Sequence, residues 1–162
     1  MRSGDVDDAA RLEPDLDLLF ALHRARWRGG ASAFRWEPFH REFAAAAFER
    51  GWLRLWFLEL DGRPAAAWYG FRFAGIESFY QSGRDPDSPG DSVGFVLLAH
   101  SIREALRDGV REYRLLRGDE TYKYRFADAD PGVSTIAAGR GLAGRSAAIG
   151  GAARYWLAAR RL

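Results

Sequence analysis

The sequence predicts an α/β protein, of the α+β kind, in which helices flank one mixed and mostly antiparallel sheet. Two segments before residue 51 repeat apolar side chains at helical spacing. Three segments rich in aliphatic and aromatic residues follow, separated by tight-turn pairs, and a third amphipathic segment then leads to a short apolar one. Consecutive hairpins build antiparallel neighbours, whereas a strand, helix and strand in succession add a parallel neighbour.

The first two elements are expected to be helices. The first is predicted to begin after Pro14, because Asp15 and Asp17 would then lie in its first turn, where the helix dipole favours acids. Its apolar stripe consists of Leu18, Leu19, Leu22 and Ala25. The second helix is predicted over Pro38 to Arg50. One side of it carries Phe39, Phe43, Ala46 and Ala47.

Three strands are expected next. Residues 52–60 are dense in Leu, Trp and Phe, which predicts a strand covered on both faces. Asp61-Gly62 is a hairpin signal, and residues 65–73 form the returning strand. Ala74-Gly75 makes another turn, and residues 77–83 form the third strand.

The remaining elements complete a β-α-β unit. A helix is predicted from Ser92 to Asp108, and a short strand from Tyr113 to Leu116 follows it. The buried stripe of this helix is expected to comprise Phe95, Leu98, Ile102, Ala105 and Leu106. The state of residues 118–127 stays open, residues 133–138 are expected to add a strand, and a last helix is expected from Arg145.

The domain organisation is expected to comprise a polar lead-in over residues 1–12, one domain over residues 13–140, and a basic tail or helix over residues 141–162. No apolar run reaches about 18 residues, so no membrane-spanning helix is expected. The acidic start has no apolar segment and does not resemble a signal peptide, which predicts a cytoplasmic protein. The chain has no cysteine and three scattered histidines, which excludes disulfides and argues against a metal site.

Charge is unevenly distributed. The net charge is only +2, but five arginines and no acidic residue follow Asp130. The rest of the chain is therefore net negative, which argues against a nucleic-acid partner. The tail is either a solvated end or a segment that contacts an anionic membrane.

Lys123 is unusual, because it is the one lysine among 24 basic residues other than histidine. Lysine carries a compact ammonium and can lose its proton when buried, and arginine does neither. Either a site needs one of these properties, or chance has left one lysine in an arginine-rich sequence.

Several motifs resemble a known family. Residues 116–123 read LRGDETYK and resemble the LRGDExYK motif of the FemAB/CelD-like acetyltransferases, a group of the GNAT superfamily found with cellulose and exopolysaccharide biosynthesis. Residues 22–27 (LHRARW) are similar to the family's LHxxRW helix, and residues 53–69 resemble its strand pair. Residues 80–86 (YQSGRDP) and 92–94 (SVG) are similar to its YQSGxDP loop and SxG helix start.

The resemblance covers residues 9–130 and departs from the family in three ways. Members of the family typically have two GNAT-like halves, and this chain resembles only the second half. The usual Q/R-x-x-G-x-G/A phosphate loop is not intact, and Arg114 stands where many relatives have an acid. A homodimer or a partner carrying the other GNAT half would complete such a pair.

The resemblance implies a GNAT fold and a GNAT-type N-acetyltransferase of the EC 2.3.1 class. Such an enzyme would move an acetyl or other acyl group from acetyl-CoA or another acyl-CoA to an amine or hydroxyl. The acceptor would be a small molecule or a glycan, for example a cell-envelope polysaccharide or its precursor. Two alternatives stay open, namely a Fem-type transferase that uses aminoacyl-tRNA and a non-catalytic binding or assembly module.

Candidate site residues follow from the chemistry of acyl transfer. Helix-start amides bind phosphate groups, so the cofactor-binding residues are expected to be Ser92, Val93, Gly94 and Arg117. An acceptor needs a base and a proton path, for which the candidates are Asp119, Glu120, Tyr122 and Lys123. Acceptor contacts are expected from Arg26, Trp27, Tyr80 and Gln81. Each has a structural alternative: an ordinary helix start, a surface salt-bridge cluster including Arg125, or a core tryptophan.

Overall fold

The computed structural model describes residues 8–26, 34, 36–88, 92–132, 140, 141, 144, 146, 149 and 150. The chain divides into two compact units, Met1–Phe126 and Ala127–Leu162. In the second unit the Gly132 amide donates to Asp130 Oδ1 at 3.1 Å. The strand expected over residues 133–138 and most of the helix expected from Arg145 lie outside the described residues.

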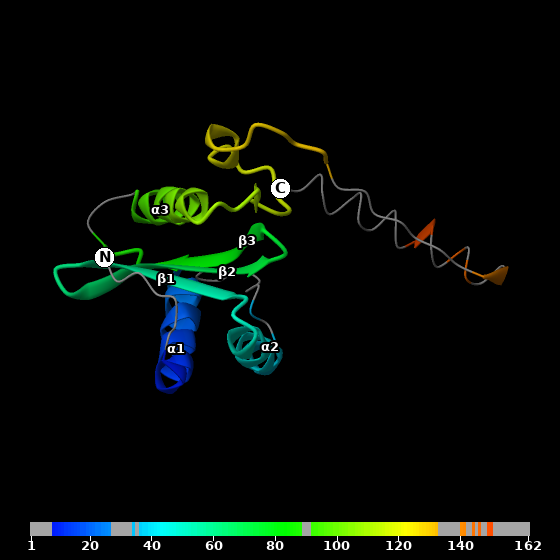
Figure 1. The fold of residues 1–162 in the computed structure, drawn as a ribbon. Coiled ribbons are helices and arrows are strands. Elements are labelled where there is room, and N and C mark those ends of the chain that lie inside the picture. Colours follow the sequence, from blue (N-terminus) through cyan, green and yellow to red (C-terminus); the bar gives the residue numbers. More distant parts are fainter. Residues whose placement is uncertain are drawn as a thin grey trace. The chain divides into compact units, whose positions relative to one another are not determined.

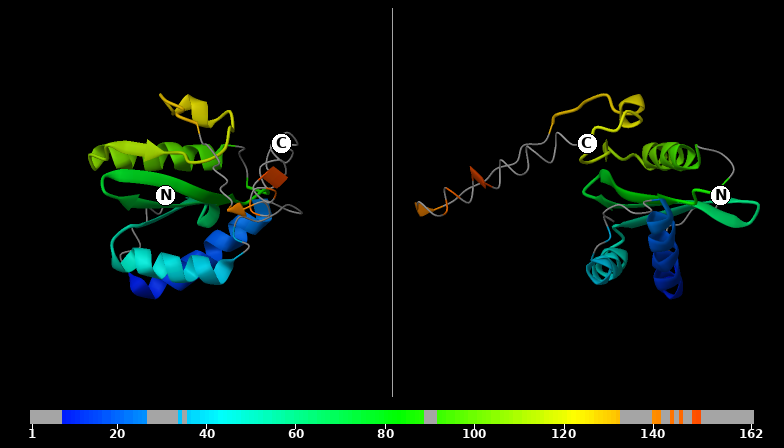
Figure 2. Two further views of the ribbon diagram at one scale, coloured as in Figure 1. Left: turned by 90° about the vertical axis from the view of Figure 1, so that its right-hand side faces the viewer. Right: turned by 180° about the vertical axis from the view of Figure 1, so that it is seen from behind.

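The first unit is a four-stranded sheet with helices on both faces (Figure 1). Its elements are, in order, α1 (Ala9–Arg26), α2 (Glu37–Glu49), β1 (Leu53–Leu60), β2 (Arg63–Phe73), β3 (Ile76–Arg84), α3 (Val93–Arg107), β4 (Glu112–Arg114) and a short 3-10 turn, η1 (Lys123–Arg125). Two views from other sides show α1 and α2 on one face of the sheet and α3 on the other (Figure 2). The expected sequence of helices and strands is confirmed through β4.

The sheet order is β1-β2-β3-β4. The first three strands are antiparallel neighbours, as the turn pairs predicted. Asp61 and Gly62 have φ values of 51° and 75°, and Ala74 and Gly75 have values of 50° and 76°, which fit turns with two left-handed residues. β4 is parallel to β3, as expected of a β-α-β unit.

Two hydrophobic clusters form the core of this unit. One lies between the sheet and the pair α1 and α2, and includes Leu16, Leu19, Leu55 and Tyr69. The other lies between the sheet and α3, and includes Trp56, Trp68, Phe79 and Leu97. Among the described residues no helix combines the length and the apolar character that a membrane span requires.

Helix α1 begins before Pro14, so its predicted start was wrong, and residues 9–12 belong to it rather than to a polar lead-in. The Asp8 carboxylate accepts a hydrogen bond of 2.9 Å from the Ala10 amide and caps the helix. Leu12 is buried and extends the apolar stripe by one turn. Pro14 lies inside the helix and has no backbone N–H to donate, which is unfavourable. The burial of Leu12 and the Asp8 cap offset that cost.

The buried faces of α2 and α3 also differ from the prediction. α2 buries His40, Ala44 and Ala47, and it leaves Phe39 and Phe43 exposed. The Trp52 amide donates to the Ala47 carbonyl and the Gly51 amide to the Phe48 carbonyl, and Gly51 has φ of 68°, so these bonds close the end of the helix. In α3, Leu106 is exposed. Ser101 is buried and donates to the Leu98 carbonyl at 2.8 Å.

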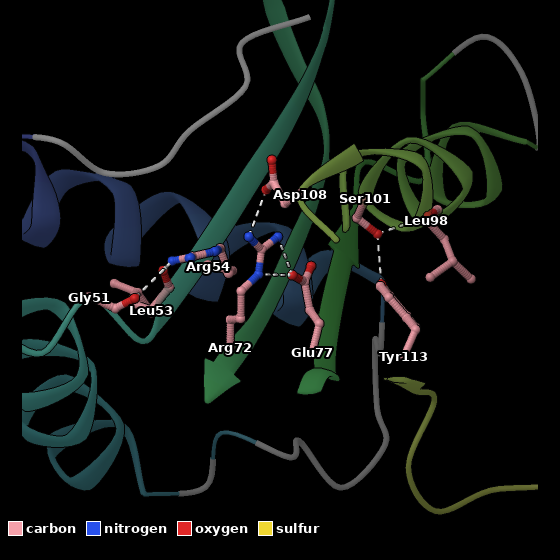
Figure 3. A network of polar contacts seen from close by, with 9 residues as sticks. All are labelled: Gly51, Leu53, Arg54, Arg72, Glu77, Leu98, Ser101, Asp108 and Tyr113. Atoms are coloured by element: carbon pink, nitrogen blue, oxygen red, sulfur yellow. Dashed lines mark hydrogen bonds and ion pairs between the residues drawn. The ribbon is translucent and has the colours of Figure 1, made fainter. Parts of the chain in front are cut away.

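A buried polar network ties the short strand β4 to the rest of the unit (Figure 3). Arg72 on β2 pairs with the fully buried Glu77 on β3 at 2.6 Å and with Asp108, the residue after α3, at 2.6 Å. The Tyr113 hydroxyl on β4 shares a hydrogen bond of 2.7 Å with Ser101 on α3. These contacts fix the end of β3 at which β4 pairs.

Candidate functional site

The carboxyl-terminal half of β3 is the first component of the candidate site. β4 pairs with β3 only at Ile76, Glu77 and Ser78, whereas β3 continues to Arg84. On its other edge the register with β2 shifts, so that Tyr69 faces Gln81 and Gly70 faces Phe79. Tyr80 is therefore the extra residue of a β-bulge. Bulges turn side chains in new directions and are frequent next to active sites.

The last turn of α1 packs closely on this half of β3. The His23 ring nitrogen Nδ1 lies 2.8 Å from the Ser82 carbonyl, and Arg26 Nη1 donates to Ser82 Oγ at 2.7 Å. A Cβ at Gly83 would lie 2.4 Å from the backbone nitrogen of His23, so only glycine allows this approach. The contacts fix Arg26 beside the bulged segment.

The LRGDETYK segment forms a loop that its own lysine holds together. Lys123 is buried, and its ammonium donates to the Arg117 carbonyl at 2.9 Å and pairs with Glu120 Oε2 at 2.8 Å. Gly118 has φ of 123°, and a Cβ there would lie 2.3 Å from Glu120 Oε2 and 2.8 Å from Lys123 Nζ. Glycine at position 118 is therefore favoured by its backbone conformation, and a larger residue there would also displace the ends of the Glu120 and Lys123 side chains.

Charged and polar groups of this loop face the end of α1. Burial raises the pKa of Glu120, but the hydrogen bond with Lys123, a backbone hydrogen bond and the charges of Lys123 and Arg26 together outweigh it, and the net pKa is lowered. Burial and the Glu120 charge raise the pKa of Tyr122, while Arg26 opposes the change. Burial lowers the pKa of Arg26, and Tyr122 and Glu120 act against that. Near neutral pH the site therefore presents an ionised carboxylate, a protonated phenol and a guanidinium in one neighbourhood.

The start of α3 is the third component. Ser92 is its N-cap residue but makes no side-chain cap hydrogen bond, and the first turn contains no acidic residue. The ring of Phe126, just after η1, lies 4.9 Å from that of Phe95 in the first turn. This contact brings the end of the LRGDETYK loop to the start of α3. A Cβ at Gly94 would meet no atom within 4 Å, so the space beside this glycine is open.

A hollow of about 500 Å³ lies on the α1 and α2 side of β3. Its described lining comprises Trp36, Phe39, His40 and Tyr80. Tyr80, the bulge residue, thus borders both the hollow and the open half of β3. No group of three His, Cys, Asp or Glu side chains that could hold a metal ion occurs in the described part of the chain.

The structure brings together most of the residues that the sequence singled out. Arg26, Glu120, Tyr122 and Lys123 form one neighbourhood, and Ser92, Val93 and Gly94 open the helix on which the same loop packs. Tyr80 and Gln81 lie on the bulged segment. Asp119 and Arg117 are exposed, and Arg117 offers its carbonyl to Lys123. Trp27 lies outside the described residues.

Sequence reasoning missed Ser82 and three of the residues that line the hollow. Ser82 lies in the YQSGRDP segment, but nothing in that motif indicates Arg26 as its partner. Trp36, Phe39 and His40 did carry a signal, because an aromatic residue recurs at the start of α2. The sequence places Phe39 on one side of this helix with Phe43, Ala46 and Ala47, and in the structure both Trp36 and Phe39 are largely exposed.

Comparison with solved structures identifies the fold. The ribosomal-protein-S18-alanine N-acetyltransferase from Escherichia coli is 19% identical in sequence. The alignment covers 76% of this chain and 70% of that chain, with a TM-score of 0.52. A GNAT family acetyltransferase from Brucella melitensis, in complex with acetyl-CoA, is 16% identical over 79% of this chain and 81% of that one, with a TM-score of 0.57. A predicted acetyltransferase with acetyl-CoA from Clostridium acetobutylicum is 15% identical over 83% and 94%, with a TM-score of 0.55. The predicted GNAT fold is confirmed.

Comparison of sequences identifies the family. No curated protein matches the sequence. The family model described as acetyltransferase (GNAT) domain matches residues 2–124, which includes every helix and strand of the first unit. The expectation of a GNAT-type acetyltransferase is thereby confirmed. The chain belongs to the acetyltransferase (GNAT) domain family.

Proposed function

We propose that the protein transfers an acetyl or other acyl group from an acyl-CoA, acetyl-CoA first of all, to an amine or hydroxyl acceptor. The observation that carries the proposal is the half of β3 beyond Ser78, which β4 does not pair, next to a helix start without its own cap or acid. Two of the similar solved structures contain acetyl-CoA. The α3 start and the LRGDETYK loop are the parts of this chain that fit such a donor.

Donor binding is assigned to the first turn of α3. The backbone amides of Ser92, Val93 and Gly94 point out of the helix start, where the helix dipole favours a phosphate group. No described residue places an atom within 4 Å of a Cβ built at Gly94, so a phosphate can approach the backbone closely there. Arg117, exposed on the neighbouring loop, is the candidate for a further contact with anionic groups.

Proton transfer is assigned to the LRGDETYK loop. An acyl-CoA supplies an activated acyl group as a thioester. Transfer joins the acyl carbon to the acceptor and breaks the carbon–sulfur bond, so one proton must leave the acceptor and one must reach the sulfur. Glu120, kept ionised by Lys123, is the candidate base, and the exposed Asp119 is the second candidate. Tyr122, whose pKa is raised, is the candidate proton donor.

Lys123 and Arg26 have supporting roles in this proposal. The Lys123 ammonium is engaged by Glu120 and the Arg117 carbonyl, so it positions the base. Arg26, held by Ser82, is placed to orient the acceptor together with Gln81.

The finer identity of the protein is part of the same proposal. The LRGDETYK, YQSGRDP and LHRARW segments support membership of the FemAB/CelD-like group and an acceptor from cell-envelope polysaccharide biosynthesis. A cytoplasmic location fits a donor whose phosphate charges oppose passage through a bilayer.

Thermal unfolding with and without acetyl-CoA tests donor binding. A bound donor at about 100 times its dissociation constant should stabilise the protein by about 2.7 kcal/mol. Gly94→Asp should not destabilise the free protein, because an acid in the first turn suits the helix dipole, but it should abolish the acetyl-CoA shift by repelling the phosphates. Gly94→Ala is the uncharged control and should keep most of the shift.

Absence of an acetyl-CoA shift in the unaltered protein would contradict the proposal. Salt-sensitive retention of tRNA together with that absence would favour the aminoacyl-tRNA donor instead.

A further inference from the structure

The aromatic hollow over the β3 bulge has a composition that selects a class of acceptor. We propose that it binds the uncharged ring of an amino sugar, and leaves the amine at its edge on the side of Ser82 and Arg26. This inference rests on the proposed function, since it names the acceptor of that same site. The hollow has room for one sugar ring, with a volume of about 500 Å³.

The walls are aromatic and are held in place by ring contacts. Trp36 and Phe39 are 71% and 59% exposed, and Tyr80 is 37% exposed. The His40 ring lies 5.3 Å from Phe39 and 5.7 Å from Tyr80, and Tyr80 lies 5.9 Å from the buried Tyr69 ring. Exposed aromatic faces that gather in one hollow mark a binding surface rather than a core. Their negative faces attract the C–H groups that line the flat side of a pyranose.

The polar atoms of the lining suit a ring bearing hydroxyls. Trp36 carries an indole N–H and Tyr80 a hydroxyl, so two exposed lining residues can hydrogen-bond to a ligand. The described lining contains no carboxylate, lysine or arginine. Among these described lining residues a phosphate or a carboxylate would find no counter-charge, whereas a neutral sugar ring would find both an apolar wall and polar partners.

The position of Tyr80 connects the hollow to the proposed chemistry. Tyr80 is the bulge residue of β3, and Ser82, two residues further on, holds Arg26. Arg26 in turn lies in the neighbourhood of Glu120 and Tyr122. Arg26 thus connects the strand that carries Tyr80 with the loop that carries the candidate base and proton donor.

Acceptor selectivity and binding together test the inference. The probes are the methyl glycoside of D-glucosamine, ethanolamine as an amine without a ring, and benzylamine as an amine on an aromatic ring. Acetyl transfer is measured by thiol release, and binding is measured by saturation-transfer NMR, which needs no turnover. The variants are Trp36→Ala and Phe39→Ala. Phe73→Ala is the matched control, because Phe73 is 60% exposed and does not line the hollow.

The glucosaminide should have a KM at least about tenfold lower than ethanolamine, and both hollow variants should raise it about tenfold with kcat and the KM for acetyl-CoA unchanged. Phe73→Ala should change none of these. The inference would be overturned by equal KM values for the glucosaminide and ethanolamine, or by a preference for benzylamine. It would also be overturned by equal effects of Phe39→Ala and Phe73→Ala, or by the absence of saturation transfer from millimolar glucosaminide. A missing thermal shift with acetyl-CoA would show that the donor proposal has failed. The NMR experiment measures sugar binding without turnover, so it still tests the present inference separately.

Discussion

Lys123 shows how one side chain can organise a loop. Its ammonium lies between the Arg117 carbonyl and the Glu120 carboxylate, and a Cβ at Gly118 would lie 2.8 Å from it. A guanidinium is wider and planar, so arginine would not fit between these two partners without moving the loop. The single lysine of this arginine-rich sequence therefore lies at a position, 123, where a compact cation fits and a guanidinium does not.

His23 is a second residue whose burial has a measurable consequence. It is 1% exposed and its ring lies against Phe34 at 4.6 Å and against the Ser82 carbonyl. Burial lowers the pKa of His23 below 6.5, the Ser82 hydrogen bond opposes the change, and Arg26 and Arg24 add to it. The unfolded chain therefore takes up this proton at a higher pH than the folded protein does.

Stability should consequently depend on pH through His23. The stabilisation that depends on neutral His23 should be complete above about pH 6.5. It should be lost as the pH falls through the lower pKa of the folded state. His23→Gln removes this titration, so its stability should fall less over the same range, although His100, whose pKa is also lowered, keeps part of the effect. Urea unfolding across this pH range measures the difference. The same pH dependence in both proteins would show that His23 is not the group responsible.

At the scale of elements, β4 is a short strand whose position depends on buried polar contacts. It has three residues and pairs with β3 over the same number. Arg72, Glu77 and Asp108 join β2, β3 and the end of α3 beside this pairing. Burial raises the pKa of Glu77, while Arg72 opposes that change. Removal of Arg72 would leave a fully buried carboxyl group without its cation.

Arg72→Met should therefore lower the free energy of unfolding by about 3–5 kcal/mol. The double variant Arg72→Met/Glu77→Met should recover much of that loss, because it removes both charges and fills the space with apolar groups. Chemical denaturation of the three proteins gives the values.

The matched control is Arg107→Met, which breaks the largely exposed Arg107–Glu104 pair and should cost less than about 1 kcal/mol. Equal losses for Arg72→Met and Arg107→Met would contradict the assigned role of the buried network.

At the scale of the whole molecule, the first unit contains both hydrophobic clusters. Every residue of the two clusters lies between Leu12 and Phe126, and the match to the family ends at residue 124. Among the described residues, the sheet and helices thus bury apolar side chains on both faces within residues 8–126, and such burial is the main favourable term of folding.

A chain that ends after Phe126 should consequently fold by itself. Its far-UV circular dichroism should show the same helices and strands, and its midpoint of thermal unfolding should lie within a few degrees of that of the full chain. The acetyl-CoA shift, if it occurs in the full chain, should persist in the shortened one. A shortened chain without a cooperative unfolding transition would show that residues 127–162 are part of the folding unit.

The succession of helices and strands and the positions of the turns could be predicted from the sequence alone. Helical periodicity marked α2 and α3, Asp61-Gly62 and Ala74-Gly75 marked the hairpins, and the β-α-β order required a parallel β4. These features depend on interactions between residues close in the chain, so a single sequence reports them. The LRGDETYK segment also singled out the loop that carries Glu120, Tyr122 and Lys123.

Only the tertiary structure decided which faces are buried and which side chains meet. The β-bulge at Tyr80 is a property of the register between β2 and β3, and the exposure of Phe39 follows from the close packing of Ala44 and Ala47. The burial of Lys123 likewise depends on a loop folding back on itself at Gly118. Such outcomes depend on contacts between distant segments, whose geometry local propensity does not specify.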